Sequence, residues 1–229
     1  MSNDVELVVL QDADAVAEAV AQRLARAAAA GGKVVLTGGR TPEQAYERAA
    51  SLAPDWSRVE LWWGDERCVP PDDENSNFGM AKRALLDRLE RLPFVVHRIE
   101  GELGKDAGAD AYEEELGTTA LDLLLLGIGP DGHVASLFPG KPSLDEADRR
   151  VVGTEAGLEP WVDRITLTLP ALRAAGEILF VVAGETKADA ARRAFAGEPN
   201  RETPASLVRA VSGRTTAILD RAAAGALEA

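Results

Sequence analysis

The chain has 229 residues, 46% of them hydrophobic, so it can bury a substantial core in one large α/β domain or two small ones. Its 38 acidic and 25 basic residues give a formal net charge of −13, which argues against nucleic acid or an anionic membrane surface as a partner. The single cysteine, Cys68, excludes an internal disulfide framework and indicates a reducing compartment; we interpret it as incidental rather than nucleophilic. The first ten residues lack the pattern of a signal peptide, and no apolar run is long enough to span a bilayer.

The first predicted elements are a strand at Val5–Leu10 and a helix that runs to about Ala30. Asp12 or Asp14 can cap the start of this helix, and Gly31 is placed to end it. Apolar residues recur along the helix at intervals of four, which is the spacing of one buried face. The chain therefore begins with a strand followed by an amphipathic helix.

A short strand at residues 33–36 runs into a glycine-rich turn at the start of the next helix, which contains Gly38, Gly39, Arg40, Thr41 and Pro42. Thr41 fits the N-cap, Pro42 fits the first helical position, and Gln44 completes the spacing of a capping box. Glycines let backbone amides approach a ligand, and a helix N-terminus attracts anions through its free N–H groups and its dipole. We therefore predict a phosphate-binding site at this turn; an ordinary tight turn is the alternative.

A charged run follows the third predicted strand, Val59–Trp63, and consists of Asp65, Glu66 and Arg67. Such a run is normally a solvated turn. It is, however, one of three polar turns that come directly after a strand, and open α/β folds bind ligands at the carboxyl ends of their strands. A further strand is expected at residues 95–99, where we interpret His97 as structural because no glycine turn or acid accompanies it.

Residues 122–140, DLLLLGIGPDGHVASLFPG, are the most informative stretch of the chain. Leu123–Leu126 is short for a helix and is typical of a parallel strand buried on both faces. Glycines and a proline then interrupt regular structure, and Asp131 and His133 lie inside this break. An imidazole has an ordinary pKa of about 6.5 and is well suited to moving protons near neutral pH. A structural loop histidine is the alternative, but the strand end, the glycines and the acid favour a catalytic His133.

The segment at residues 139–163 is rich in proline, glycine and charge, so we expect a long excursion that holds only a short strand at residues 151–152. Residues 164–168 alternate polar and apolar side chains, as a strand with one solvated face does. The other elements expected in this part of the chain are a short helix at Pro170, another at Pro204, a strand at residues 215–219 and a helix at residues 221–227.

Lys187 follows a buried strand predicted at residues 177–183 and occupies the first turn of a helix predicted at residues 186–195. A cation at a helix N-terminus is electrostatically unfavourable. This local cost suggests that Lys187 serves a ligand, and a solvated lysine is the alternative.

Strands and helices alternate throughout the chain, which predicts the α/β class. We expect a three-layer α/β/α, Rossmann-like arrangement with a mostly parallel sheet, in a single catalytic domain over residues 1–229. The sequence shows no internal repeat or flexible linker.

Five segments resemble the 6-phosphogluconolactonase family; in chain order they read TGGRTP, WGDER, GIGPDGHVASLFPG, RITLT and GETKA. The resemblance spans about residues 5–220, and its DGH-x-ASLFPG segment is highly specific, whereas TGGRTP alone is weak. It implies a Rossmann-like sheet, no metal, and hydrolysis of 6-phospho-D-glucono-1,5-lactone to 6-phospho-D-gluconate in the oxidative pentose phosphate pathway. We accordingly expect a cytoplasmic hydrolase without a cofactor, a monomer or homodimer, whose ligand is a phosphorylated sugar lactone.

The family belongs to a wider sugar-phosphate superfamily with glucosamine-6-phosphate deaminase, and two places favour the lactonase. Deaminases carry an Asn-Glu-Pro tripeptide shortly after the histidine, whose glutamate assists ring opening, whereas this chain has no acid between Ser136 and Pro139. Deaminases also have a Met-Asp-Glu-Tyr-like turn where this chain reads Gly64-Asp65-Glu66-Arg67. Many relatives have serine where Arg40 stands, so this chain departs from them at the phosphate turn.

The resemblance, together with the residues, leads to a mechanistic hypothesis. His133 is the expected general base that activates water against C1, and Asp131 orients the imidazole or binds a sugar hydroxyl. Arg67, or backbone amides of residues 127–132, stabilises the developing oxyanion. The resemblance places the phosphate of the substrate among the amides of Gly38, Gly39, Arg40 and Thr41 and the side chains of Arg164 and Lys187. Asp65 is a further expected substrate-binding residue.

Two other functions fit the same class of fold. One is an aldose–ketose isomerase or amino-sugar-phosphate deaminase, which ammonia release from glucosamine 6-phosphate distinguishes. The other is a sugar-phosphate sensor domain of a transcriptional regulator, which needs a DNA-binding segment for which we expect neither the length nor a basic patch.

Overall fold

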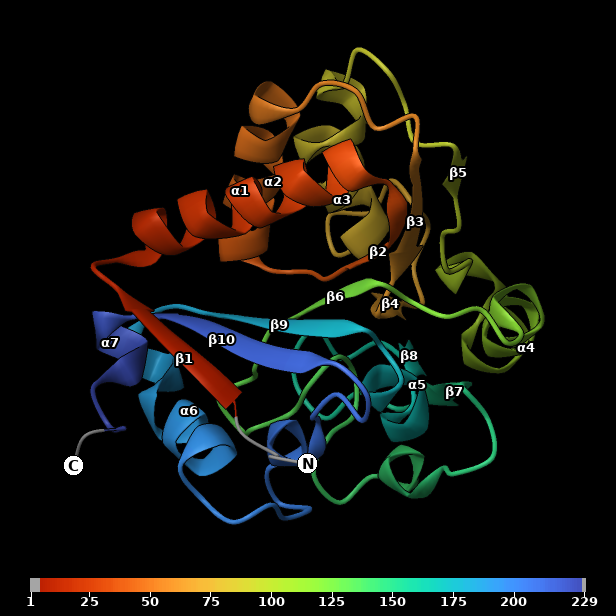
Figure 1. Cartoon of the computed structure of the whole chain (residues 1–229). Coiled ribbons are helices and arrows are strands. Elements are labelled where there is room, and N and C mark those ends of the chain that lie inside the picture. Colours follow the sequence, from red (N-terminus) through yellow and green to blue (C-terminus); the bar gives the residue numbers. More distant parts are fainter. Residues whose placement is uncertain (1–4, 228–229) are drawn as a thin grey trace.

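The computed structural model describes residues 5–227, and its central feature is a seven-stranded sheet between two layers of helices (Figure 1). The ends of the domain expected over residues 1–229 lie outside this range. The strands are β1 (Val5–Leu10), β2 (Gly32–Leu36), β3 (Val59–Trp63), β4 (Asp65–Arg67), β5 (Val95–Val96), β6 (Leu123–Leu126), β7 (Val151–Thr154), β8 (Arg164–Leu167), β9 (Glu177–Val182) and β10 (Arg214–Asp220). The α-helices are α1 (Ala13–Ala30), α2 (Arg40–Leu52), α3 (Asn77–Ala84), α4 (Lys105–Leu116), α5 (Leu169–Arg173), α6 (Ala188–Phe195) and α7 (Arg221–Ala224).

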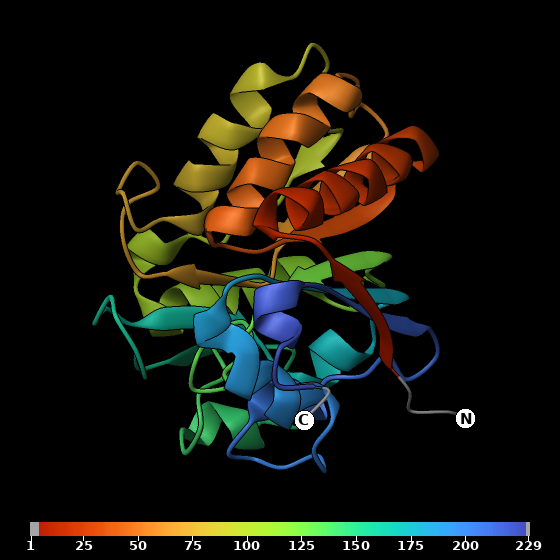
Figure 2. The same ribbon diagram turned by 90° about the vertical axis from the view of Figure 1, so that its left-hand side faces the viewer.

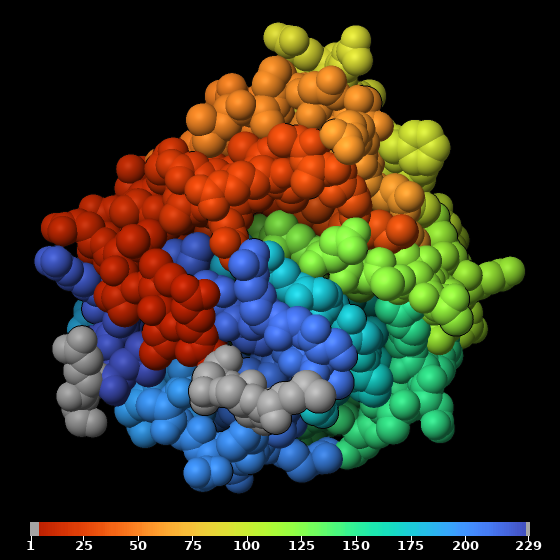
Figure 3. All heavy atoms as spheres, in the orientation of Figure 1, coloured from red at the N-terminus to blue at the C-terminus, as the bar shows by residue number. Residues whose placement is uncertain are grey.

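The large sheet has the order β1-β10-β9-β6-β2-β3-β5, and every pairing in it is parallel. Helices α1, α2 and α3 cover one face, and α5, α6 and α7 cover the other, as the two perpendicular views show (Figure 1 and Figure 2). The N-terminal segment lies beside the C-terminal part of the chain because β1 pairs with β10 (Figure 3). The predicted α/β class with a mostly parallel sheet is confirmed.

The strongest apolar patterns form the predicted elements. All four leucines of β6 are buried, as expected for a strand in the middle of a sheet with helices on both faces. Strands β1 and β3 have the predicted bounds. Asp12 caps α1 by accepting a hydrogen bond from the backbone amide of Ala15 at 2.9 Å, and Gly31 ends this helix.

The capping box predicted at Thr41 is wrong. Helix α2 begins two residues earlier than predicted, at Arg40 rather than Pro42, and its N-cap is Gly39, which makes no side-chain capping bond. Gly39 has a φ of 112°, a region that favours glycine. The helix therefore starts at a glycine with positive φ and not at a residue whose side chain caps it.

A second, three-stranded sheet of order β4-β8-β7 was not predicted. The charged run at residues 65–67, expected to be a turn, pairs antiparallel with β8. Strand β8 is buried at all four positions, so the solvated face predicted for it is also wrong. It lies between two strands, and α4 packs against it. The strand predicted at residues 95–99 shortens to Val95–Val96.

The topology determines where a ligand can bind. From β2 the sheet grows in one direction through β3 to β5, and from β6 it grows in the other through β9 to β10. The reversal lies between β2 and β6, and a crevice opens outside the carboxyl ends of strands at such a point. The four neighbouring strands β9, β6, β2 and β3 lead into all three predicted polar turns and into Lys187. Within residues 5–227, no helix is long and apolar enough to cross a membrane.

Candidate active site

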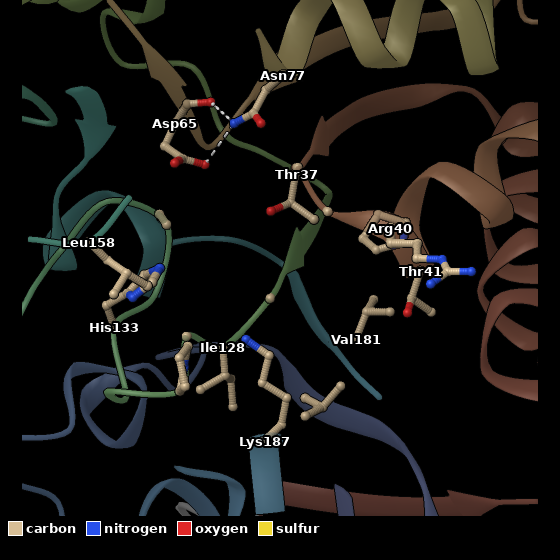
Figure 4. A pocket seen from close by; sticks show the side chains of 18 of the residues that line it. Thr37, Arg40, Thr41, Asp65, Asn77, Ile128, His133, Leu158, Val181 and Lys187 are labelled. Atoms are coloured by element: carbon tan, nitrogen blue, oxygen red, sulfur yellow. Dashed lines mark hydrogen bonds between the residues drawn. The ribbon is translucent and has the colours of Figure 1, made fainter. Parts of the chain in front are cut away.

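A polar crevice of about 350 Å³ opens at the carboxyl ends of the central strands (Figure 4). It is lined by residues of all three predicted turns. Predicted site residues in its wall are Gly38, Gly39, Arg40, Thr41, Asp65, Arg67, His133 and Lys187. Asp131 lies directly behind His133, to which it is hydrogen-bonded. The structure therefore brings together every predicted site residue except Arg164, which is described below.

His133 and Asp131 form a short pair within the turn after β6. The Nδ1 of His133 lies 2.6 Å from Oδ1 of Asp131, which also accepts the backbone N–H of His133 at 3.1 Å. The turn is closed by the amide of Gly129, which donates to the carbonyl of His133 at 2.9 Å. A Cβ on Gly129 would overlap the imidazole and the carboxylate, so the pair needs glycine at this position. Gly132 adopts a φ of 94°, which also favours glycine.

This pair favours one tautomer of the imidazole, because a carboxylate can only accept a hydrogen bond. With Nδ1–H donating to the carboxylate, the neutral imidazole keeps Nε2 free to accept a proton. Burial acts to raise the pKa of Asp131, but hydrogen bonds from His133 and its charge outweigh burial and lower that pKa below 3.8. Asp131 is thus an anion that can stabilise the imidazolium formed when His133 takes up a proton.

The turn at residues 38–41 presents free backbone amides, which are groups that can bind an anion. Because α2 begins at Arg40, the amides of its first turn point out of the helix without an intrahelical acceptor. A Cβ on Gly38 would overlap the side-chain oxygen of Asn77, so this glycine lets the turn lie against α3. In Figure 4 the guanidinium of Arg40 points away from His133, and the backbone rather than this side chain faces the crevice.

A hydrogen-bond network joins the two sides of the crevice through Asp65, which is only 7% exposed. Its Oδ2 accepts the hydroxyl of Ser136 at 2.6 Å, and its backbone carbonyl accepts the side-chain amide of Asn77 at 3.0 Å (Figure 4). The amide of Ser136 donates in turn to the hydroxyl of Thr166 at 3.1 Å. Sequence reasoning missed Asn77, Ser136 and Thr166, because nothing local reveals partners that are up to 71 residues apart.

Glu66 has a structural role that its place in a charged run concealed. It is 2% exposed and accepts hydrogen bonds from the hydroxyl of Ser76 and from the amides of Asn77 and Phe78 at the start of α3. Burial raises its pKa, and these hydrogen bonds oppose the rise. The neighbouring Arg67 instead lines the crevice, and one of its guanidinium nitrogens donates to the carbonyl of Asn75.

Lys187 comes from the opposite layer of the molecule. It ends a 3₁₀ turn, Glu185–Lys187, and forms the N-cap of α6, so the single helix predicted here is divided. The amino group points into the crevice near Ile128 (Figure 4). Burial lowers the pKa of Lys187, and the nearby Asp131 carboxylate partly opposes this. A partly desolvated ammonium therefore lines the same crevice as the free amides of residues 39–41 and adds local positive charge in an acidic protein.

Arg164 does not line the crevice, contrary to the prediction that it contacts phosphate. It is 2% exposed, and its guanidinium donates to three backbone carbonyls. The side chain lies behind the crevice wall, because β8 runs between β4 and β7 with all its residues buried.

The other two residues considered from the sequence lie away from the proposed chemistry. His97 stacks on Trp62 with ring centroids 3.7 Å apart, which fits the structural role expected of it. The expectation that no acid accompanies His97 is wrong, because its Nδ1 lies 2.6 Å from Oε1 of Glu115. Burial raises the pKa of the Cys68 thiol to about 11, so it is a poor nucleophile near neutral pH. Within residues 5–227 no three or more His, Cys, Asp or Glu side chains are grouped to hold a metal ion.

Comparisons with known proteins agree with this geometry. The family model described as glucosamine-6-phosphate isomerases/6-phosphogluconolactonase matches residues 11–217. The 6-phosphogluconolactonase of Streptomyces coelicolor is 42% identical over 99% of this chain and 96% of its own length, and that of Mycobacterium tuberculosis is 39% identical over 99% of both.

Solved structures show the same architecture. A 6-phosphogluconolactonase from Thermotoga maritima is 31% identical, with a TM-score of 0.83 over 95% of this chain and all of that one. The enzyme from Trypanosoma cruzi is 25% identical, with a TM-score of 0.88 over all of this chain and 99% of that one. A monomeric glucosamine-6-phosphate deaminase also shares the fold, at 20% identity and a TM-score of 0.86 over 97% of this chain and all of that one. The chain belongs to the glucosamine-6-phosphate isomerase/6-phosphogluconolactonase family.

Proposed function

We propose that the protein hydrolyses 6-phospho-D-glucono-1,5-lactone to 6-phospho-D-gluconate, the lactone-opening step of the oxidative pentose phosphate pathway, without a metal ion. The observation that carries this proposal is that a histidine–carboxylate pair, a glycine-rich turn at a helix N-terminus and a lysine share one crevice. The histidine–carboxylate pair can activate water for hydrolysis of the lactone ester. The turn and the lysine can bind the phosphate group of the same molecule. The names of the relatives described above support the substrate.

In this proposal the phosphate binds the amides of residues 39–41 and the ammonium of Lys187, which lines the same crevice from the other layer. A phosphate dianion accepts several hydrogen bonds at once, which the free amides of a helix N-terminus provide together with a favourable dipole. The local cation is needed because the chain carries a net charge of −13. Asp65 also lines the crevice, and we expect its carboxylate to accept a hydrogen bond from a hydroxyl group of the sugar.

The chemical step begins at C1 of the lactone. Nε2 of His133 accepts a proton from a water molecule as the water oxygen bonds to C1, and the carbonyl π electrons move to the carbonyl oxygen. The imidazolium that forms is stabilised by Asp131 through Nδ1–H. A general base of this kind contributes roughly 10²–10⁴-fold to the rate.

The tetrahedral oxyanion needs a donor, and Arg67 is placed to supply it. Two amides of the turn after β6, those of Gly129 and Gly132, already donate to carbonyls within that turn. Arg67 lines the crevice and has further N–H groups besides those directed at Asn75. One such donor is worth about 3 kcal/mol in the transition state.

Collapse of this intermediate opens the ring. The C1–O5 bond breaks, the bond electrons go to the ring oxygen, and His133 returns its proton to that oxygen. The product is the open-chain acid, which ionises to the carboxylate. No covalent enzyme intermediate is required, because a δ-lactone is already an activated ester.

The proposal is tested by following freshly generated lactone in the presence and absence of purified protein. We expect loss of the lactone well above the spontaneous rate, and the same rate after treatment with EDTA. An unaccelerated reaction would overturn the substrate assignment. Activity that EDTA removes and a divalent cation restores would overturn the metal-free mechanism.

A further inference from the structure

The segment that connects β7 to β8 forms one wall of the crevice. We call residues 157–162 the strap; its members Leu158 and Glu159 line the same crevice as His133, and Leu158 is labelled in Figure 4. The strap belongs to no helix or strand, so its conformation depends on side chains that hold its backbone.

Arg164 holds the strap from behind. Its Nη1 donates to the carbonyl of Val162 at 2.8 Å, and its Nη2 donates to the carbonyls of Pro160 at 2.7 Å and Leu158 at 3.3 Å. A guanidinium is a planar fork that can bind several oxygens in fixed directions, which an ammonium group cannot do. Arg164 is 2% exposed, and its guanidinium is hydrogen-bonded to carbonyls of the strap.

The strap also contacts the support of the imidazole. A Cβ on Gly157 would lie 2.5 Å from Cγ of Phe138, so the backbone of the strap lies flat against this ring. Phe138 is 2% exposed and packs in turn on His133, with ring centroids 4.6 Å apart. The contacts therefore form a continuous series from Arg164 through the strap and Phe138 to His133.

We propose that Arg164 is a positioning residue, which fixes the strap and through it the orientation of the His133 imidazole, and that it is not a ligand of the phosphate. This inference rests on the proposed function for its kinetic consequence, but the structural part is independent of the reaction. It also explains why a buried cation lies next to the crevice without facing it.

The natural tryptophans allow the strap to be observed directly. Trp161 lies on the strap and is 68% exposed, whereas Trp56, Trp62 and Trp63 are buried. Time-resolved fluorescence anisotropy, with Trp161→Phe used to subtract the buried residues, reports the local motion of the strap. Arg164→Lys and Arg164→Gln should both increase this motion. Arg209→Lys is the matched control, because Arg209 also donates to three carbonyls but at a different place in the fold.

Steady-state kinetics and phosphate-binding measurements distinguish a positioning role of Arg164 from a role in binding phosphate. In Arg164→Lys, which keeps the charge, we expect kcat to fall by about tenfold or more, because small misplacements of a catalytic group are costly. The dissociation constant for inorganic phosphate should be unchanged in this variant and increased in Lys187→Ala. Weaker phosphate binding in both variants, or unchanged motion of Trp161, would overturn the proposal.

Gly157→Ala tests the same series of contacts from its other end and leaves Arg164 itself in the sequence. The added methyl group should displace the strap from Phe138 and lower kcat, again with phosphate affinity unchanged; an unaltered kcat contradicts the proposal. If the wild-type protein does not hydrolyse the lactone, the proposed function fails, while the anisotropy and phosphate measurements still decide the role of Arg164.

Discussion

At the scale of single residues, the proposed mechanism gives His133 a role in the reaction and Lys187 a role in binding the phosphate. His133 is held through Nδ1 by Asp131 and presents its other nitrogen, whereas Lys187 contributes a partly buried charge from the opposite layer. The two roles predict different kinetic consequences when either residue is replaced.

Replacement of His133 by asparagine should lower kcat by roughly 10²–10⁴-fold and leave KM nearly unchanged, because the general base is lost while the phosphate site remains. The measurement is the steady-state rate with freshly generated lactone. His97→Asn provides the matched control, since the second histidine stacks on Trp62 away from the crevice. Turnover of His133→Asn within a few-fold of wild type contradicts the assignment of the base.

If Lys187 binds the phosphate as proposed, the affinity for 6-phosphogluconate should fall as the pH rises, because only the ammonium form of the lysine attracts the anion. Burial lowers the pKa of this lysine below its ordinary value of 10.5, so the fall should begin at lower pH than for an exposed lysine. Calorimetric titration at several pH values measures it. Lys187→Arg, whose charge persists, should largely remove the pH dependence, and an unchanged dependence in that variant excludes Lys187 from the phosphate site.

At the scale of elements, the turn after β6 is held in its shape by glycine. Gly129→Ala should lower kcat strongly in a protein that still folds, because a Cβ there overlaps both His133 and Asp131. Gly64→Ala is the control, since its Cβ would make only ordinary contacts, of which the nearest is 3.7 Å, at a position next to Asp65. Equal activities of the two variants, each shown to be folded by circular dichroism, would contradict this account of the turn.

The same scale shows what the sequence could and could not predict. Strands β1, β3 and β6 were predicted with their bounds because apolar residues dominate each of them, a pattern that can be recognised locally. The second sheet was missed because β4 is three charged residues long, and only its pairing with β8, about a hundred residues later, makes it a strand.

The site divides in the same way. The His133 turn and the turn at residues 38–41 were predicted from local glycine patterns and from the resemblance. Asn77 and Ser136 were missed, and Arg164 was assigned to the crevice although it holds backbone carbonyls behind it. In each case the partner is chosen by tertiary packing, which residue type alone does not reveal.

At the scale of the whole molecule, the fold by itself does not determine the reaction, because a deaminase shares it at a TM-score of 0.86. The choice between lactone hydrolysis and deamination rests on the residues from Ser136 to Pro139. This chain has no acid there, and the hydroxyl of Ser136 is hydrogen-bonded to Asp65. We therefore expect no ammonia from glucosamine 6-phosphate under conditions in which the lactone is hydrolysed. Release of ammonia at a comparable rate would contradict the choice between the two reactions.

The most direct test of the account as a whole is a crystal structure of the protein with bound 6-phosphogluconate. It should show the phosphate on the amides of residues 39–41 beside the amino group of Lys187, and the carboxyl carbon of the same molecule facing Nε2 of His133. A phosphate bound elsewhere, or a carboxyl group turned away from the imidazole, would contradict the claim that both sites act on one substrate.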